Sequence, residues 1–199
     1  MNRLLFIIFL LLFGHVSGQK TFVPDDNFEA YLEANGMGDG IANNDSVNTN
    51  QINSVNNLNI IGQSIIDLTG IEDFLALTDI SCDFNQITSL NLSNNPFLEH
   101  VTCDNNQLTA LNLSNGNNNL LNSFSAISNP DLYCIQVNDE GYMYANFPYP
   151  FSIDQHTSYS NNCVAKTYVP DNNFENYLET HDRLGSIVSI GDPTSMGDG

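Results

Sequence analysis

The feature that most constrains this chain is a tandem repeat, in which residues 77–97 and residues 98–118 carry the same pattern of apolar and polar positions. Each matched position recurs 21 residues later, and each segment places an asparagine, Asn85 or Asn106, three residues after its cysteine. A regular repeat of this kind argues against low-complexity disorder, although asparagine is very common in the chain. The matched apolar positions are Leu77, Ile80, Cys82, Ile87, Leu90 and Leu92 in the first segment and Leu98, Val101, Cys103, Leu108, Leu111 and Leu113 in the second.

The repeat continues in both directions along the chain. The same apolar positions occur 22 residues earlier in residues 55–68, and they reappear downstream between Leu121 and Val137. The shared pattern is LxxLxLxxNxLxxLxL, and a period of about 20–29 residues with this consensus is typical of leucine-rich repeats. We therefore predict a leucine-rich repeat solenoid of the α/β type over residues 55–137, with a parallel strand ladder of about four coils.

A single repeat cannot bury its own apolar side, so the coils are expected to stack and share one core. Each coil would contribute one strand, one turn and one return segment. In the strands, Ile80, Val101 and Phe124 should lie in register and point inward. The asparagine after each strand can both donate and accept hydrogen bonds, so it is expected to satisfy turn backbone in its own coil and in the next.

Residues 1–18 have the pattern of a secretory signal peptide rather than of part of the fold. Arg3 precedes an unbroken apolar run from Leu4 to Phe13, and Val16-Ser17-Gly18 follows as a small-residue cleavage site. The run is shorter than the roughly 20 apolar residues that a membrane span needs, although a retained N-terminal anchor is an alternative. We predict an exported chain without membrane insertion, either secreted or on a bacterial cell surface.

The charge of the chain limits the partners that it can have. The formal net charge is −19, with only 4 lysine and arginine residues in total. Binding to nucleic acid or to an anionic membrane surface requires basic side chains, so both are excluded as partners. Basic proteins and divalent cations remain compatible with this charge, and solubility outside the cell is the simpler explanation for it.

The segment before the repeats is expected to cap the open end of the stack. TFVPDDNFEAYLEANG begins at Thr21, with acidic residues at a helix start and Asn35-Gly36 as a helix stop. We predict a cap over residues 21–54 whose short amphipathic helix covers the first coil near Val55 and Leu58.

A similar phrase, TYVPDNNFENYLETHD, begins at Thr167. Residues 167–199 are therefore predicted to form the cap of a second, truncated repeat unit, and the chain to be a fragment.

The four cysteines fall into two groups. Cys134 and Cys163 flank the end of the repeats, and an exported chain favours a disulfide between them. This bond would close a C-terminal cap loop over residues 138–166. Cys82 and Cys103 lie in the core pattern and are expected to be buried free thiols, with a disulfide between them as the alternative.

The cap loop also contains a group of aromatic side chains. We expect them to cover the core of the last coil, with an aromatic binding patch as the alternative. These residues are Tyr142, Tyr144, Phe147, Tyr149 and Phe151.

Several phrases give the chain a family resemblance. VPDDNFEAYLE, the segment DLTGIEDFLAL at residues 67–77, and CDNNQLTALNLSN at residues 103–115 resemble the exported leucine-rich repeat proteins of Bacteroidetes-type bacteria. The cap and the 22-residue first coil also resemble the internalin-like subclass. The resemblance covers residues 21–163 and begins again at Thr167. It implies a binding or adhesion module, in a family whose full-length members often end in a secretion-system sorting domain.

A concave strand face is the usual binding surface of stacked repeats, so the outward strand positions are the predicted binding site. Asp83 and Asp104 should stand one strand spacing apart and repel each other, so either solvent screens them or a cation or a basic partner side chain lies there. The predicted contact residues are Asp79, Ser81, Asp83, Phe84, His100, Thr102, Asp104, Ser123 and Ser125.

Other ligand and catalytic patterns are weak. Asp39, Asn43, Asn44 and Asp45 could hold calcium on one loop, but their spacing does not match an EF-hand and a turn is favoured. His100 and Cys103 would point to opposite faces of a strand and cannot share a metal. We find no nucleophile elbow or phosphate-binding glycine loop, so we predict neither a cofactor nor catalysis.

The leading functional hypothesis is therefore a non-catalytic binding or adhesion module that contacts an unknown protein or glycan ligand on its concave strand face. A passive structural spacer and an accessory domain of an enzyme whose catalytic part lies beyond Gly199 are the alternatives. The sequence does not name the ligand.

Overall fold

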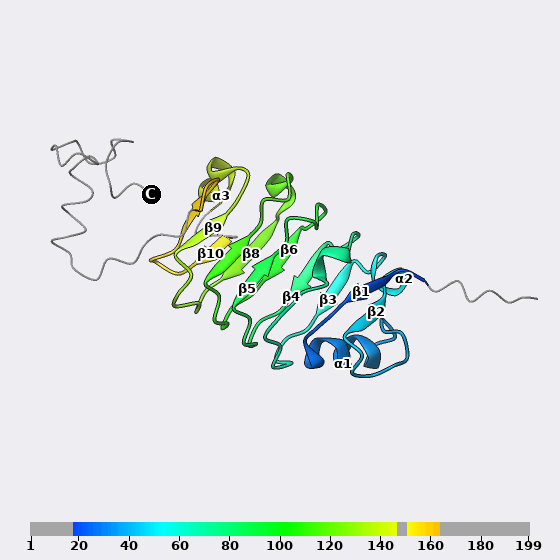
Figure 1. Ribbon diagram of the computed structural model, residues 1–199. Helices are drawn as coiled ribbons and strands as arrows, with labels where there is room; N and C mark the ends of the chain where they lie inside the picture. The colour runs from blue at the N-terminus through cyan, green and yellow to red at the C-terminus, as the bar shows by residue number, and fades with distance from the viewer. Residues whose placement is uncertain (1–17, 147–150, 164–199) are drawn as a thin grey trace, which may run out of the picture.

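The computed structural model describes residues 18–146 and 151–163 of the chain. These residues form an elongated stack of coils with a helix at one end and a disulfide at the other (Figure 1). The predicted signal peptide up to residue 17 and the predicted second cap lie outside the described residues. Among the described helices, none has the length and apolar character needed to cross a membrane.

One strand from each coil contributes to a five-stranded parallel sheet, which we call the first sheet. The buried residue at the centre of each strand lies in register with that of the next, so the predicted column of Ile80, Val101 and Phe124 is confirmed. The sheet has one strand more than the predicted ladder of about four coils. Its strands, in spatial order, are β3 (Asn57–Asn59), β4 (Asp79–Ser81), β6 (His100–Thr102), β8 (Ser123–Ala126) and β10 (Phe151–Ile153).

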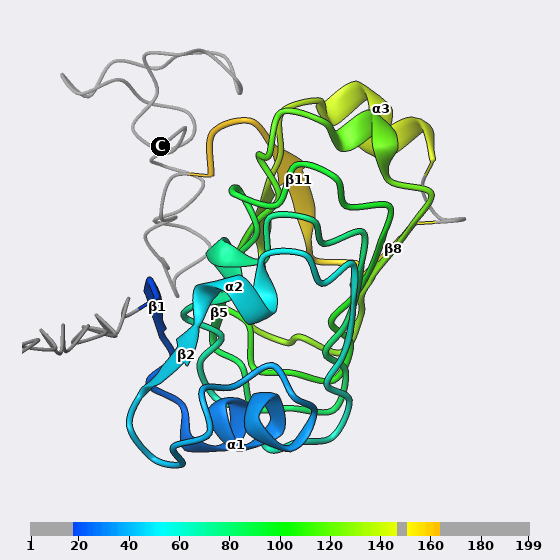
Figure 2. The same ribbon diagram turned by 90° about the vertical axis from the view of Figure 1, so that its right-hand side faces the viewer.

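The return segments form a second parallel sheet on the opposite side of the core (Figure 2). Its strands are β5 (Ser89–Asn91), β7 (Ala110–Asn112), β9 (Cys134–Gln136) and β11 (Ser158–Ser160). The prediction of an α/β-type solenoid is therefore wrong for the return segments. Leu90 and Leu92 alternate with outward polar residues, and this period of two builds a strand rather than a helix. Between the coils from β3 to β8, the described helical geometry is two short 3-10 turns, η1 (Ile71–Asp73) and η2 (Asn118–Leu120).

Buried asparagines join each coil to its neighbour. The Asn85 amide donates to the carbonyls of Ile60 and Cys82 at 2.8 and 2.9 Å, while its oxygen accepts from the backbone N–H of Ile65 at 3.1 Å. Asn106 and its equivalent in the next coil repeat this arrangement. The predicted role of this column is confirmed, except that the second coil each asparagine reaches is the preceding one and not the next.

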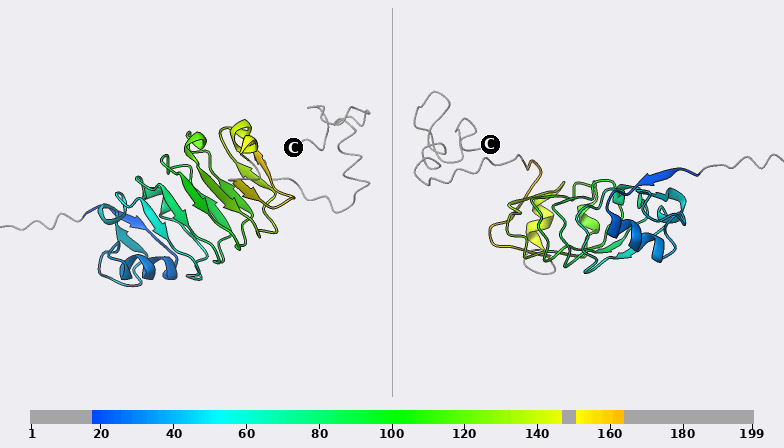
Figure 3. Two further views of the ribbon diagram at one scale, coloured as in Figure 1. Left: turned by 180° about the vertical axis from the view of Figure 1, so that it is seen from behind. Right: turned by 60° about the horizontal axis from the view of Figure 1, so that its bottom comes forward.

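The N-terminal segment closes the first end of the stack (Figure 3). Helix α1 (Asp26–Ala34) begins after Asp25, whose Oδ1 accepts from two backbone N–H groups of the first turn. Its other oxygen accepts from the backbone of Ile66 and Asp67, so one carboxylate ties the helix to the first coil. The ring of Phe28 stacks on Phe74 of that coil at 6.3 Å. Alongside lie the antiparallel strands β1 (Lys20–Phe22) and β2 (Ser46–Asn48) and the short helix α2 (Thr49–Ile52).

The C-terminal segment differs from the predicted cap loop. Over its described part it forms helix α3 (Glu140–Ala145) and the strands β10 and β11, which extend both sheets by one strand. Phe151 occupies the core column rather than a cover, because it aligns with Phe124. Tyr142 packs on the Phe151 ring, as predicted for covering aromatics, whereas Phe147 and Tyr149 lie outside the described residues.

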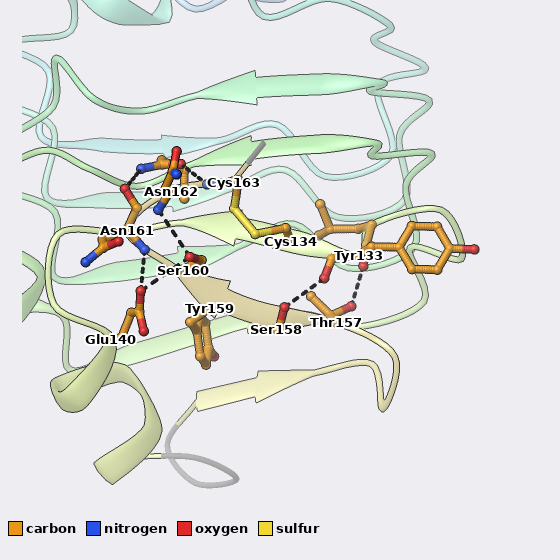
Figure 4. Close-up of a disulfide and its surroundings, with 12 residues drawn as sticks. Tyr133, Cys134, Glu140, Thr157, Ser158, Tyr159, Ser160, Asn161, Asn162 and Cys163 are labelled. Atoms are coloured by element: carbon orange, nitrogen blue, oxygen red, sulfur yellow. Dashed lines mark hydrogen bonds between the residues drawn. A yellow bond between two sulfur atoms is a disulfide. The ribbon is translucent and has the colours of Figure 1, made fainter. Parts of the chain in front are cut away.

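The predicted disulfide between Cys134 and Cys163 is present, with a Cα–Cα distance of 5.8 Å. Figure 4 shows that it joins β9 to the chain immediately after β11. It therefore links neighbouring strands of the second sheet. Cys82 and Cys103 are free and buried, as predicted.

Candidate functional site

The predicted contact residues lie on the outer side of the first sheet, a surface that we call the first-sheet face. Register places Asp79, His100 and Ser123 in one row across three strands, and Ser81, Thr102 and Ser125 in the next. Asp83, Phe84 and Asp104 follow where the strands end. The fold thus brings the predicted set together, because these strands are consecutive and parallel.

The two aspartates at the strand ends have structural partners, which neither predicted alternative, solvent screening or a positive group beside them, included. Asp83 accepts hydrogen bonds from the Thr102 hydroxyl at 2.9 Å and from the backbone N–H of Asp104 at 2.7 Å. Asp104 accepts in the same way from the Ser125 hydroxyl at 2.6 Å and the Ile127 N–H at 2.8 Å. Each carboxylate therefore fastens its coil to the following one, and neither screening alone nor a bound cation is needed to explain the pair.

The surroundings of Asp104 disfavour its ionised form. Burial raises the pKa of the Asp104 carboxyl above its ordinary value, and the nearby carboxylates of Asp83 and Asp154 raise it further. The hydrogen bonds from Ser125 and Ile127 act in the opposite direction. Since the raising effects prevail, Asp104 holds its proton more tightly than an isolated aspartate does.

The two rows that precede these aspartates carry most of the remaining predicted contact residues. Asp79 accepts from the hydroxyl of Thr78 at 2.5 Å, and His100 beside it is exposed. Ser81, Ser123 and Ser125 are half-buried between the strands. Because the serine side chains are short, a bulky side chain beside them projects further into solvent than they do.

Phe84 is that larger side chain. It is 64% exposed, and its φ of 56° lies in the left-handed region. The equivalent left-handed positions in the other coils hold Gly62, Asn105 and Ser128. Glycine and asparagine adopt this conformation readily, but a bulky side chain there is a conformational outlier. The sequence marked Phe84 as a contact residue without indicating this strain.

Apolar residues that the predicted set omitted lie at other strand ends of the same face. Ile61 belongs to the preceding coil and is 41% exposed, while Ile127 two coils further along is 39% exposed. They occupy the positions equivalent to Asp83 and Asp104. Their outward placement was visible in the repeat pattern, but their exposure was not.

The loop proposed as an alternative calcium site uses its oxygen atoms internally. Asp39 pairs with Lys20 and also accepts from the Asn44 amide, and the bond to Lys20 lowers the Asp39 pKa to about 2. The Asn44 oxygen accepts from the backbone N–H of Ser46. Glu29, which is buried, accepts from the backbone of Asn44 and Asp45. These contacts support the turn interpretation.

The two free thiols are not suited to chemistry. Cys82 and Cys103 are fully buried, and burial raises the pKa of both thiols well above the usual range. Each thiol donates to a carbonyl of the following coil, at 3.3 Å for Cys82. They therefore behave as small core residues.

Two hollows of the described surface lie over the second sheet. One is a shallow groove of about 820 Å³ across β5, β7 and β9, and an adjoining hollow of about 450 Å³ lies beside η1. The sequence predicted helix-containing return segments here and so gave no indication of a groove.

No family model matches the chain. Internalin J of Listeria monocytogenes serotype 4b (strain F2365) is 33% identical to it over 82 residues, which make up 41% of this chain and 9% of that protein. The solved functional domain of InlJ from Listeria monocytogenes, which includes a cysteine ladder, aligns with 22% identity and a TM-score of 0.39, covering 61% of this chain and 38% of that chain. The sequence match supports the internalin-like part of the predicted resemblance, whereas the attribution to Bacteroidetes-type bacteria stays a prediction.

Proposed function

We propose that this chain is a non-catalytic binding or adhesion module of an exported or cell-surface protein, and that its partner docks on the first-sheet face with Phe84 as the anchor. The observation that carries the proposal is the exposed aromatic side chain of Phe84 on left-handed backbone. A bulky residue in this conformation costs about 1–2 kcal/mol, and such strain concentrates at functional sites. Aromatic side chains, phenylalanine among them, are also enriched at protein interfaces.

The charges around Phe84 favour a partner with basic side chains. Asp79, Asp83 and Asp104 lie on the same face, and in the described part of the chain the only lysine or arginine is Lys20, which pairs with Asp39 in the N-terminal segment. A lysine or arginine placed over an aromatic ring gains about 0.5–1 kcal/mol at an exposed site. The partner proposed here is a protein with a basic, solvent-exposed segment.

Two further observations support an extracellular adhesive role. The Cys134–Cys163 disulfide fits an oxidising compartment. The sequence similarity to Internalin J extends over 82 residues of this chain. The match covers about a tenth of that protein, so a role shared with the whole of Internalin J is part of the proposal.

The test compares Phe84→Gly with the matched variant Asn105→Gly, since both positions have left-handed backbone in successive coils. The probe is an arginine-rich peptide, and its affinity is measured by fluorescence anisotropy at low and at high salt. Phe84→Gly should weaken binding about two- to fivefold, as loss of a cation–π contact predicts. It should also raise the free energy of unfolding by about 0.5–1 kcal/mol, because glycine relieves the strain.

Asn105→Gly should change both quantities much less. A residue that serves only stability would not show a gain in stability together with a loss of binding. Equal affinity of Phe84→Gly and the unchanged chain, or no binding to the peptide at all, would overturn the proposed role and favour a passive spacer. Substituting Asp83 or Asp104 would be a poorer test, because both carboxylates hold neighbouring coils together.

A further inference from the structure

We infer that the groove over the second sheet is a second binding site, and that it takes an uncharged, hydroxyl-rich ligand, namely a neutral glycan. This site is separate from the first-sheet face, because the core lies between the two sheets (Figure 2). The inference therefore goes beyond the proposed function and does not depend on it.

The floor of the groove presents two amide groups as hydrogen-bond donors. Asn91 and Asn112 lie in register on β5 and β7, about 4.8 Å apart across the sheet. The Asn91 oxygen accepts from the backbone N–H of Ser93 at 3.2 Å, and the Asn112 oxygen accepts from Ser114 at 2.9 Å. These bonds fix the orientation of each side chain. Neither amide nitrogen donates to any residue of the described ranges, so both remain available to a ligand.

The shape of the groove is suited to a flat ligand. Ser89 and Ala110 lie in register with each other, next to the pair of asparagines. Their short side chains leave this part of the groove open. The leucines at the centres of these strands are only 2% exposed, so the apolar part of the groove surface comes mainly from its other lining residues, such as Ala110 and Tyr133.

Tyr133 provides an aromatic wall at the β9 end. It lines the groove, is 51% exposed, and packs its ring against that of His156 at 5.3 Å. Figure 4 shows the Tyr133 ring projecting outward beside β9. The negative face of an aromatic ring attracts the C–H groups of a sugar, while amide donors bind its hydroxyl oxygens.

The charge of the groove distinguishes this ligand from ionic ones. None of the side chains that line it is ionised at neutral pH, although the chain carries a net charge of −19. Carboxylates first occur in the adjoining hollow, at Asp67 and Glu72. A cationic ligand finds no partner in the groove, and an anionic ligand is repelled by the chain as a whole. A neutral polar ligand is the one class that meets neither obstacle.

The experiment measures binding of the full chain to short oligosaccharides in three groups: neutral (glucose, xylose, mannose or N-acetylglucosamine units), anionic (uronic acid units) and cationic (glucosamine units). We expect retention of neutral members. The double variant Asn91→Ala/Asn112→Ala removes both donors and should weaken that binding about tenfold or more. The matched control is Asn59→Ala, because Asn59 accepts from Ile61 N–H in the same local way on the first sheet.

A second variant guards against misfolding. Ala110→Arg fills the centre of the groove from an exposed position without removing a hydrogen bond, and it should abolish binding of neutral oligosaccharides. Phe84→Gly should leave this binding unchanged, which separates failure of this inference from failure of the proposed function. The inference is overturned by retention of charged oligosaccharides alone, by no retention, or by equal affinity of the groove variants. It is also overturned if these variants change only self-association in sedimentation measurements, because the face would then contact a second copy.

Discussion

Polar side chains near the strand ends of the two sheets differ in which coil they bind. On the first sheet, Asp83 and Asp104 accept from hydroxyl and N–H groups of the following coil. On the second sheet, Asn91 and Asn112 accept only from the turn of their own coil and keep their amide donors free. The carboxylates of Asp83 and Asp104 therefore hold neighbouring coils together, whereas the amide N–H groups of Asn91 and Asn112 can still donate to a ligand.

This difference shows that surface charge is a poor guide to a binding site in a stacked fold. A carboxylate at a coil boundary lies within hydrogen-bonding distance of backbone N–H groups of the next coil, and it accepts hydrogen bonds from them. A partner is therefore more readily bound by side chains without this structural role, such as Phe84 on the first sheet or the Asn91 and Asn112 amides on the second.

The largest effect is expected at the end of the second sheet. Replacing both disulfide cysteines, Cys134→Ser/Cys163→Ser, removes a covalent link of 29-residue separation between β9 and the chain after β11. The chain-entropy model predicts a loss of about 3–4 kcal/mol in the free energy of unfolding, measured by urea denaturation. Reduction of the unchanged chain should give the same loss. A loss below about 1 kcal/mol would show that packing alone holds β11.

A smaller loss of stability is expected when a hydrogen bond between coils is removed, and a still smaller one when the bond lies within one coil. Asp83→Ala leaves the Thr102 hydroxyl and the Asp104 N–H without their acceptor, and should lower the free energy of unfolding by about 2 kcal/mol. Asn91→Ala removes one exposed local bond that water can replace, so its effect should stay within about 0.5 kcal/mol. Equal losses, measured in the same urea titrations, would contradict the distinction between the sheets.

The smallest effect is a pH dependence that belongs to the first sheet. The Asp104 pKa is raised in the native state, so the native chain holds a proton over a pH range in which the unfolded chain has released it. The free energy of unfolding should therefore decrease as pH rises through this range. Asp104→Asn keeps an oxygen to accept from Ser125 and Ile127 and should remove that decrease.

The pH effect can be checked by urea denaturation between the ordinary aspartate pKa and neutrality. Asp39 contributes in the opposite direction, because its pKa is lowered to about 2 and its stabilisation is lost as pH falls. The Asp104→Asn variant leaves that contribution in place. A decrease of unchanged size in this variant would assign the effect to another carboxyl group.

The repeat period carried most of the information about the core. The positions of Ile80, Val101 and Phe124 fixed the register of the first sheet, because one residue of slip would turn each of them outward. The disulfide also followed from sequence, since Cys134 and Cys163 fell outside the core columns. Phe151 did not, because its aromatic neighbours suggested a cover and the repeat spacing is lost before it.

The candidate sites were less accessible to sequence reasoning. The positions of Asp83 and Asp104 one coil apart were predicted, but their partners belong to the backbone and hydroxyl groups of the next coil, whose directions no residue pattern specifies. The strain at Phe84 is likewise a backbone property. The groove arises because the return segments are strands, and the leucine-rich consensus alone suggested a helix-containing return.

The two polar columns also bear on how such a chain can change in length. Within an interior coil, the aspartate serves the coil ahead and the asparagine serves the coil behind. Residues 98–118 therefore contain both the aspartate and the asparagine of such a junction, together with the groups that these two side chains bind in a neighbouring coil. An in-frame duplication of this segment would preserve these two sets of hydrogen bonds, so the solenoid could lengthen by one coil in a single genetic step.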